Sequence, residues 1–489
     1  MKVKLLDQTH RDYDGTQLAQ LDALFEGGTK WRALLDTWLP KLAREPDDSW
    51  QERKALATYT NEAGPIVSML SALLFSESPE VEAPGEFWPV FAADCDRHGT
   101  TLAAFLQVML DAAQVGGRAY AWVNLPQQEG PTPATLAEQD GAGLRRAFVV
   151  PLTATQVRNW GRDELGLAWL LARGLVEEQA GPTEPISRRI RWTAITRTTI
   201  IQWEWTPTEE QREPGPDSEA VEVRRVEHGA GMLPVVDLVL PPGLWTMGKL
   251  ADVALRATRA ENDLGWALHQ AANELLVIKS KAKGEITLGH GAYLVLGQDD
   301  DASFVAPTGV AFEHLERREE SSRQALYRVV HQMAVAADPG ASADKASGES
   351  KAMDWQALGV ILSAYQALVL AAAKRVVEVA AALRGETAEV AVTGLEGWRT
   401  EDLGTWLEQV IMAPDAARMS PTYRKEVAKH QARRLLGQAV APGVLDQVLA
   451  EIDKAAVEDP AAYPVGPGKE VQEPPPKDDD DDGDGADQG

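Results

Sequence analysis

The second half of this sequence has three long stretches of helical periodicity. These stretches, together with the segments that separate them, restrict the folds that the chain can adopt. Apolar and small residues recur at intervals of three and four over 244–273, 310–335 and 351–385. The segment 274–308 instead has short runs of β-branched residues, which predict a compact β module. A run of small and polar residues, AADPGASADKASGESK (336–351), separates the last two helical stretches. The order is therefore helix, β module, helix, flexible loop, helix.

The loop is longer than helix packing requires. A helical hairpin needs a connection of roughly two to eight residues. Glycine, alanine and serine dominate this one, and glycine permits many backbone conformations. We therefore expect the loop to have a task beyond joining two helices.

The third helical stretch contains 19 consecutive residues without a charge, from Trp355 to Ala373. This length is just enough to span a bilayer. However, the run includes Gln356, Ser363 and Gln366 and is followed at once by Lys374. We interpret it as a helix buried inside a large protein or assembly, not as a membrane span.

The first half of the chain predicts helices and then strands, so the fold class is α+β and predominantly helical. Residues 1–30 are polar and predicted to be partly ordered, whereas 31–78 and 85–117 read as helices. Alternating β-branched and aromatic residues then predict strands, and two further segments are a short apolar run and a possible late strand. The ranges are 119–125, 147–152, 166–173, 189–197 and 199–206, then 233–242 and 388–395. Residues 207–219 predict an exposed loop.

The charge balance argues against a protein that grips DNA. The net charge is −26, and the tail from Lys469 to Gly489, with nine acidic residues and two lysines, accounts for −7 of it. Proteins that read DNA normally present a basic face. A body that retains −19 could still surround DNA without holding it, because like charges repel.

No catalytic or metal-binding pattern stands out, and we predict no cofactor. GLWTMGKL (243–250) fits G-x-x-x-x-G-K, but Leu250 stands where a phosphate-binding loop needs Ser or Thr. We interpret it as a turn that precedes a helix. DCDRH (94–98) has no second His/Cys cluster to complete a metal site, so we expect a loop with one buried thiol, Cys95.

Two charged patterns have both a structural and a functional interpretation. Lys279, Lys281 and Lys283 alternate, so they would share one face of a strand. They either protect an edge strand from aggregation or face an acidic or phosphate-bearing partner. The helix 313–332 mixes both charge signs, which is typical of a solvated face or of contacts between neighbouring subunits.

The order of elements resembles the portal proteins of tailed bacteriophages over nearly the whole chain. WQERKALATYTNEAGPIVSMLSALLFSESPEV is similar to the opening helices of that family, and LPVVDLVLPPGLWTMGKLADVALRATRAENDLGWALHQAAN to the approach to its stem. ASGESKAM resembles the end of the loop before the long wing helix. MSPTYRKEVAKHQARRLLG with GVLDQVLAEIDKA resembles the helical crown.

The resemblance implies a portal fold of wing, stem, clip and crown, assembled as a ring around a central channel. Its parts would be an N-terminal arm (1–30), wing (31–243), first stem helix (244–273), clip (274–309), second stem helix (310–335), tunnel loop (336–350), long wing helix (351–385), crown (386–457) and disordered acidic tail (458–489).

The resemblance also implies partners and a location. The chain would form a homo-oligomer, a dodecamer, at one vertex of the capsid in the virion, after synthesis in the host cytoplasm. Double-stranded DNA would slide through it without sequence specificity. The large terminase, then a head–tail adaptor, and the major capsid protein would dock on it, and no membrane would be involved.

The same resemblance assigns the candidate site residues. The tunnel loop facing DNA would present Asp338, Gly340, Ser342, Asp344, Lys345, Ser347, Gly348 and Glu349. The clip would bind partners through the three alternating lysines. The stem would carry Lys249, Arg256, Arg259, Glu313, Glu316, Arg317, Glu320 and Arg323.

Two alternatives remain open from the residues themselves. One is a nucleotide-driven motor or another enzyme that uses residues 243–250. The other is a monomeric helical scaffold or adaptor. Self-assembly into a closed ring without nucleotide distinguishes the portal interpretation from both.

Overall fold

The structure is a computed structural model of the 489-residue chain, and it divides into two compact units, Met1–Arg399 and Thr400–Gly489. It is 48% helical and 21% strand, so the prediction of a mixed fold with more helix than strand is correct. The residues that the structure describes are 1–126, 135–141, 143–208, 211–272, 275–279, 301–305, 309–337, 348–386, 390–398, 425, 428–429, 432 and 442–454.

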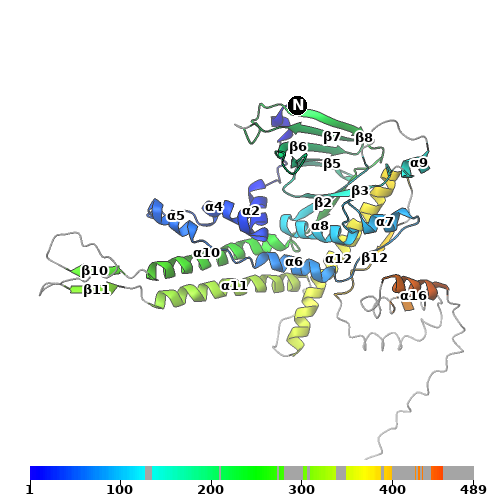
Figure 1. The fold of residues 1–489 in the computed structure, drawn as a ribbon. Helices are drawn as coiled ribbons and strands as arrows, with labels where there is room; N and C mark the ends of the chain where they lie inside the picture. The colour runs from blue at the N-terminus through cyan, green and yellow to red at the C-terminus, as the bar shows by residue number, and fades with distance from the viewer. Residues whose placement is uncertain are drawn as a thin grey trace, which may run out of the picture. The chain divides into compact units, whose positions relative to one another are not determined.

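The β-rich part of the first unit consists of two antiparallel sheets (Figure 1). The larger is a five-stranded meander of β4 (Val157–Asp163), β5 (Gly166–Glu178), β6 (Ser187–Thr196), β7 (Thr199–Trp205) and β8 (Val221–Glu227). The smaller has the order β3-β2-β9, with β2 (Arg118–Asn124), β3 (Phe148–Thr153) and β9 (Val235–Val239). The helix α9 (Leu136–Gly141) precedes β3.

The predicted strands correspond to β2, β3, β5, β6 and β7, and β9 lies in the segment predicted only as a short apolar run, whereas β4 and β8 were not predicted. Both are edge strands of the large sheet, and the bulges in their pairing with β5 and β7 break a regular alternation. β4 contains Arg158 and Arg162, and β8 contains Arg224 and Arg225. Charged residues protect sheet edges from aggregation. They also interrupt the apolar alternation by which a strand is predicted from sequence.

The large sheet is covered on both faces. On one face, Leu170 and Ile200 pack with Trp160 against Tyr120 and Val235 of the smaller sheet. On the other, the large tryptophans of β6 and β7 pack against α1 (Val3–Leu6). Period-two alternation supplies both sets of residues, because successive side chains of a strand point to opposite faces.

The N-terminal segment is folded into the body, and the expectation of a partly ordered arm is wrong. Val3 and Leu6 of α1 are buried against the large sheet. The Met1 amino group donates to the Ala220 carbonyl at 2.8 Å. Further along, α2 (Gly15–Glu26) buries Leu21 and Leu24. Short apolar faces of this kind are easily missed among polar residues.

The main core lies where three helices meet the smaller sheet. These are α6 (Ala63–Leu74), α8 (Leu102–Gly116) and α12 (Gly348–Arg384). α7 (Phe87–Ala93) joins them, and a small sheet of β1 (Glu80–Glu82) and β12 (Ala391–Thr393) lies beside this core. The helices predicted over 31–78, 85–117 and 351–385 are confirmed, although each of the first two ranges is divided into shorter helices by connecting segments.

The charge-free stretch falls within α12. Among the described residues, the segment Leu358–Arg384 is long and apolar enough to cross a membrane by length and composition, and half of its most apolar window is buried. Ile361, Tyr365, Val369 and Val376 are all buried in the main core. This packing favours the interpretation as a core helix.

A second core joins the N-terminal helices to a pair of long helices. It contains residues of α2, α3 (Gly28–Ala33), α4 (Leu35–Trp38), α6, α10 (Thr246–Ala272) and α11 (Gly309–Ala337). The helix α5 (Asp47–Ala55) follows α4 and is held by an ion pair in which Arg53 donates to Glu45. Between α10 and α11 lie the paired strands β10 (Leu275–Lys279) and β11 (Asp301–Val305).

The second unit is described only in part. Its helix α16 (Pro442–Lys454) confirms the helical pattern predicted there. Lys425 donates to the Asp453 carbonyl at 2.6 Å, and the Lys429 ammonium lies 2.6 Å from the Asp453 carboxylate.

Candidate functional site

The helix pair α10–α11 consists of two long helices, of 27 and 29 residues, with the strands β10 and β11 between them in the chain. At about 1.5 Å per residue the two helices are roughly 40 Å and 44 Å long. They run side by side (Figure 1), and contacts between them fix an antiparallel register. Arg318 lies 3.3 Å from Asp263, while Arg323, further along α11, lines a small pocket together with Ala257 and Glu261, earlier in α10. The two predicted helices are confirmed, and strand pairing between them is confirmed for the described residues 275–279 and 301–305.

Burial divides the helix pair into two halves. The proximal half of α10 buries apolar residues such as Met247, Leu250 and Val253 in the second core. From Asp263 to Gln270, and from Phe312 to Ala325 of α11, no residue is buried. The distal half nevertheless has partly or largely exposed apolar side chains, namely Leu264, Trp266, Leu268, Phe312 and Leu315.

The eight predicted stem residues fall into two groups. Arg259 donates from Nε to the Trp38 carbonyl at 3.0 Å, and Arg323 donates from Nε to Glu62 Oε1 at 2.6 Å, so these two attach the pair to the body. The remaining six are exposed and make at most contacts within their own helix. They are Lys249, Arg256, Glu313, Glu316, Arg317 and Glu320.

The segment between α5 and α6, which contains Thr58 and Thr60, holds the middle of the pair. The Thr58 amide donates to Asn262 Oδ1 at 2.9 Å, and Asn262 Nδ2 donates to the Thr58 carbonyl at 2.8 Å. Glu261 accepts hydrogen bonds from the hydroxyls of Thr58 and Thr60 at 3.2 and 2.9 Å. These partners are about two hundred residues apart in sequence, so no local pattern could reveal them.

Buried hydrogen bonds fix the start of α10. The Thr246 hydroxyl donates to Gln114 Oε1 at 3.0 Å and lies 2.8 Å from the Tyr365 hydroxyl. Gln114 donates in turn to Ser71 Oγ at 2.8 Å, and Tyr365 to the Leu244 carbonyl at 2.6 Å. Since buried polar groups are costly without partners, this chain of bonds specifies how α6, α8, α10 and α12 meet.

The phosphate-loop-like stretch is filled by its own tryptophan. Trp245 donates from Nε1 to the Val115 carbonyl at 3.0 Å, and a Cβ built on Gly248 would lie 2.4 Å from the Trp245 ring. Thr246 is buried, and Lys249 is exposed in the first turn of α10. The indole therefore occupies the space beside the turn where a phosphate would have to approach the backbone.

The structure places the predicted loop and clip residues only in part. Gly348 and Glu349 belong to the first turn of α12, so the expectation that they lie in the loop is wrong: the helix starts earlier than the small residues suggested. Lys279 ends β10, opposite Asp301. Lys281, Lys283, Asp338, Gly340, Ser342, Asp344, Lys345 and Ser347 lie outside the described residues.

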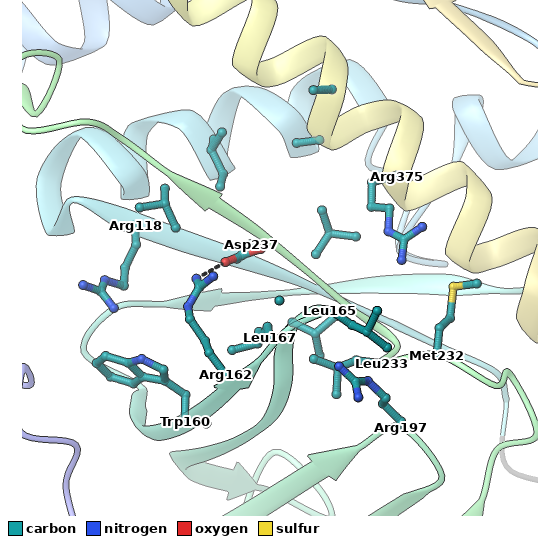
Figure 2. A pocket seen from close by; sticks show the side chains of 18 of the residues that line it. Arg118, Trp160, Arg162, Leu165, Leu167, Arg197, Met232, Leu233, Asp237 and Arg375 are labelled. Atoms are coloured by element: carbon teal, nitrogen blue, oxygen red, sulfur yellow. Dashed lines mark hydrogen bonds and ion pairs between the residues drawn. The ribbon is translucent and has the colours of Figure 1, made fainter.

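A groove of about 1210 Å³ opens between the β4–β5 hairpin, β9 and α12 (Figure 2). Apolar residues such as Leu167 and Leu233 line it, together with five arginines. Most of these arginines have a carboxylate nearby: Arg162 donates to Asp237 at 2.5 Å, and Arg197 to Asp163 at 2.6 and 2.7 Å. The groove is consequently an apolar surface with a nearly neutralised polar rim.

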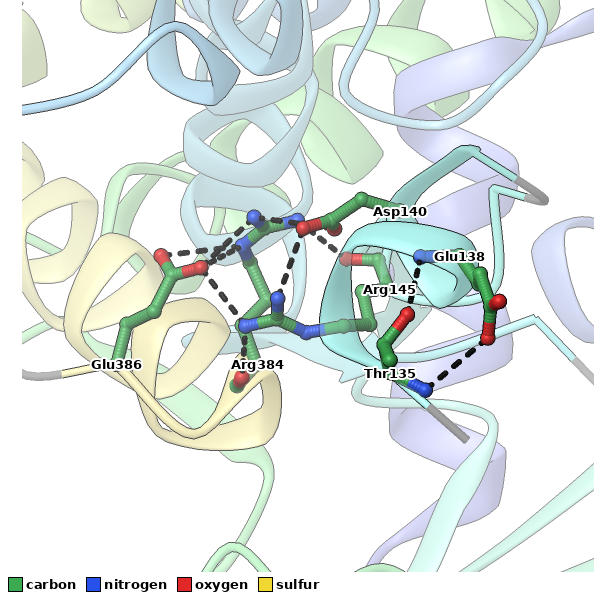
Figure 3. Close-up of polar contacts among 6 residues, drawn as sticks. All are labelled: Thr135, Glu138, Asp140, Arg145, Arg384 and Glu386. Carbon is green, nitrogen blue, oxygen red and sulfur yellow. Dashed lines mark hydrogen bonds and ion pairs between the residues drawn. The ribbon is translucent and has the colours of Figure 1, made fainter. Parts of the chain in front are cut away.

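Two buried arginines join the end of α12 to the chain before β3 (Figure 3). Arg384 donates from Nη1 to the Arg145 carbonyl at 2.6 Å, and Arg145 donates from Nη2 to the Arg384 carbonyl. Both share Glu386, at 2.8 and 2.9 Å, and Asp140. A Thr135–Glu138 capping box starts the adjacent α9. This cluster is a structural clamp, since its charges satisfy one another.

The expected loop around Cys95 is confirmed. Cys95 is fully buried, and burial raises the pKa of its thiol to about 12, which makes it unreactive. The Asp96 carboxylate accepts from the amides of His98 and Thr100, and Asp94 pairs with Arg146 at 2.5 Å. Among the described residues, no group of His, Cys, Asp and Glu could hold a metal ion.

Comparisons with known proteins give structural similarity only. No protein-family model matches the chain, and no curated protein matches it. One similar structure is a chain of the virion of a native gene transfer agent particle, with 13% identity, 84% of this chain and 99% of that chain covered, and a TM-score of 0.38. Another is a chain of the neck of an empty gene transfer agent particle with C6 symmetry, with 13% identity, coverage of 83% and 97%, and a TM-score of 0.37.

Proposed function

We propose that this chain is the subunit of a phage portal, a ring at one capsid vertex through which double-stranded DNA enters and leaves. In this proposal α10 and α11 are the stem, the segment with β10 and β11 is the clip, and the β-rich body with α12 is the wing. The residues between α11 and α12 form the tunnel loop. The clip docks the large terminase and later a head–tail adaptor.

The observation that carries the proposal is the distal half of the helix pair. Two helices in contact bury only one face of each, and most helical stability in proteins comes from tertiary packing. Here, over a length of several turns, Trp266, Leu268 and Leu315 are not buried within the chain. A ring places the pair of each subunit between the pairs of its neighbours, which covers these side chains on both sides.

The negative net charge of the chain is consistent with a channel that does not bind DNA tightly. The net charge of −26 repels DNA phosphates, so DNA inside the ring would move without many tight contacts to break. Binding would be independent of sequence. The subunit has no catalytic role in this proposal, because the separate terminase motor supplies the energy.

Electron microscopy of the purified full-length protein, without nucleotide or DNA, tests the proposal directly. We expect closed rings with a central hole in top views and a stalk in side views, with twelve subunits by native mass spectrometry. Monomers or small compact oligomers at micromolar concentration would refute the ring and support the scaffold alternative.

Nucleotide binding tests the enzyme alternative separately. Trp245 fills the turn before α10, so we expect no saturable ATP binding by the wild type and no difference in Lys249→Ala. ATP binding that is lost in Lys249→Ala would favour the motor. The exposed position of Lys249 means that this substitution should leave the fold intact.

A further inference from the structure

Three arginines gather at the polar end of one face of the five-stranded sheet. This face starts with apolar residues that pack on the smaller sheet, including Ile195 and Ile200. Two residues further along each strand come Thr193 and Gln202, which are paired and lie opposite Arg224 of β8. Two more residues along come Arg191 and Glu204, and then Arg189. The alternation of the strands thus brings Arg189, Arg191 and Arg224 to the same face.

A single buried carboxylate serves two of these arginines. Glu204 is 8% exposed and accepts from Arg189 Nη1 at 3.1 Å and from Arg191 Nε at 2.7 Å. Arg189 also pairs with Glu178 on the neighbouring strand. Glu204 and Glu178, the carboxylates beside the cluster, are therefore paired with Arg189 and Arg191 of β6.

Arg224 has no acceptor among the residues that the structure describes. Its Nε is buried without a hydrogen-bond partner, and so is the Nε of Arg189. Burial and the nearby Arg191 charge lower the pKa of Arg224, so its surroundings disfavour its charge. The next residue, Arg225, is the opposite case: it is exposed and donates to both oxygens of Glu222 at 2.8 and 2.9 Å.

A half-buried guanidinium without a counter-charge destabilises the protein that contains it, unless something binds there. Its five N–H donors form a planar fork that matches the oxygens of a carboxylate or phosphate. Arg189 and Arg191 remain partly accessible, with 27% and 31% of their side chains exposed, so a ligand can reach the cluster.

We propose that Arg224, with Arg189 and Arg191, forms a binding site for an oxyanion of the kind that a carboxylate or phosphate group presents. Arg224 supplies the unpaired charge and donors that the anion accepts. The two arginines of β6 increase the local positive potential, and Glu204 holds them in place. This site is independent of the groove and of ring formation.

The test compares Arg224→Met with the matched control Arg225→Met in the full-length protein. The Met side chain keeps most of the apolar stem of arginine and removes the charge. In chloride buffer, Arg224→Met should raise the Tm by about 2 °C, because it removes an uncompensated charge. Arg225→Met should leave the Tm unchanged or lower it slightly, since it removes an exposed, paired charge.

Adding an anion should reverse this order. At constant ionic strength, replacing chloride by inorganic phosphate should raise the Tm of the wild type and of Arg225→Met by about 2 °C more than that of Arg224→Met. A hexaglutamate peptide in place of phosphate tests the carboxylate source. Stabilisation by only one of the two anions identifies the source and supports the site.

Two outcomes would overturn the proposal. One is an Arg224→Met variant that is less stable than the wild type in chloride, since that would make Arg224 a structural residue. The other is that phosphate and hexaglutamate stabilise the wild type, Arg224→Met and Arg225→Met equally, or stabilise none of them. In either case the effect of the anions would not depend on the unpaired guanidinium of Arg224.

Discussion

The proximal half of the α10–α11 pair lies against the N-terminal helices, whereas in the distal half none of the residues whose burial is described, 263–270 and 312–325, is buried, although both halves are regular helix. Proximal α10 is fixed by the Thr246–Tyr365 hydrogen bond, by Asn262 and by apolar packing. Among the described residues, distal α10 makes exposed contacts, such as those at 3.3 Å between His269 and Glu52 of α5 and between Asp263 and Arg318 of α11. Helical periodicity alone therefore does not say whether a helix is supported by its own chain.

The largest expected effect comes from a charge placed in the distal half. Leu268 is 48% exposed in the monomer, so Leu268→Glu should leave the fold intact. If neighbouring subunits cover Leu268, the buried glutamate should abolish ring formation. Size-exclusion chromatography with light scattering measures the change.

The matched control is Val108→Glu on α8, where the side chain is 53% exposed on the body. It should assemble like the wild type. Rings formed equally well by both variants would show that the distal half is not an interface between subunits.

A smaller effect, on the free energy of unfolding, is expected from the ion pair that holds α5, the helix that contacts distal α10. Arg53 donates to both oxygens of Glu45 at 2.8 Å, and both side chains are nearly buried. Glu45→Gln leaves the Arg53 charge unpaired and should lower the free energy of unfolding by about 3 kcal/mol at pH 7. Glu26→Gln, which breaks the exposed Glu26–Lys30 pair, should lower it by less than about 1 kcal/mol.

The effect of Glu45→Gln should depend on pH in a defined direction. The hydrogen bonds from Arg53 lower the pKa of Glu45 from 4.5 to about 2. A carboxylate with a depressed pKa stabilises the folded state above its ordinary pKa, and that stabilisation is lost as the pH falls towards the folded value. The stability difference between wild type and variant should therefore shrink between pH 4.5 and 2, measured by chemical denaturation. A constant difference would contradict this origin.

The smallest expected effect on stability distinguishes Arg323 from Arg317, two arginines of α11 that the sequence analysis assigned to the same stem group. Arg323→Gln removes the 2.6 Å bond to Glu62 of the body and should lower the free energy of unfolding by about 1 kcal/mol. Arg317 contacts only Glu313 of its own helix, at 3.4 Å, so Arg317→Gln should change stability by less than about 0.5 kcal/mol. Equal losses would mean that α11 is not anchored through Arg323.

The sequence predicted elements better than it predicted contacts. Periodicity identified the helix pair, the inner strands and α12, because apolar spacing is a local property. The edge strands β4 and β8 were missed, because their arginines and bulges interrupt the alternation. The early start of α12 was missed because Gly348 and Ser350 are weak helix formers.

Within the candidate site, sequence reasoning named Arg259 and Arg323 for their charge and position on the helices, not for the partners they bind. The residues that anchor the pair, such as Asn262 and Tyr365, were not named at all. Their partners Thr58 and Thr246 are far away in sequence, and only the folded chain brings them together. Arg224 was missed for the same reason, since its lack of a partner exists only in three dimensions.

The reciprocal bonds between Arg145 and Arg384 have an evolutionary consequence. Each side chain satisfies the carbonyl of the other residue, and both neutralise Glu386 and Asp140. Loss of one arginine leaves surplus negative charge on the remaining acids, whereas joint replacement of both arginines and both acids leaves no surplus charge. Substitutions at these positions should therefore be inherited together, so that descendants of a common ancestor keep both arginines or replace both along with their acids.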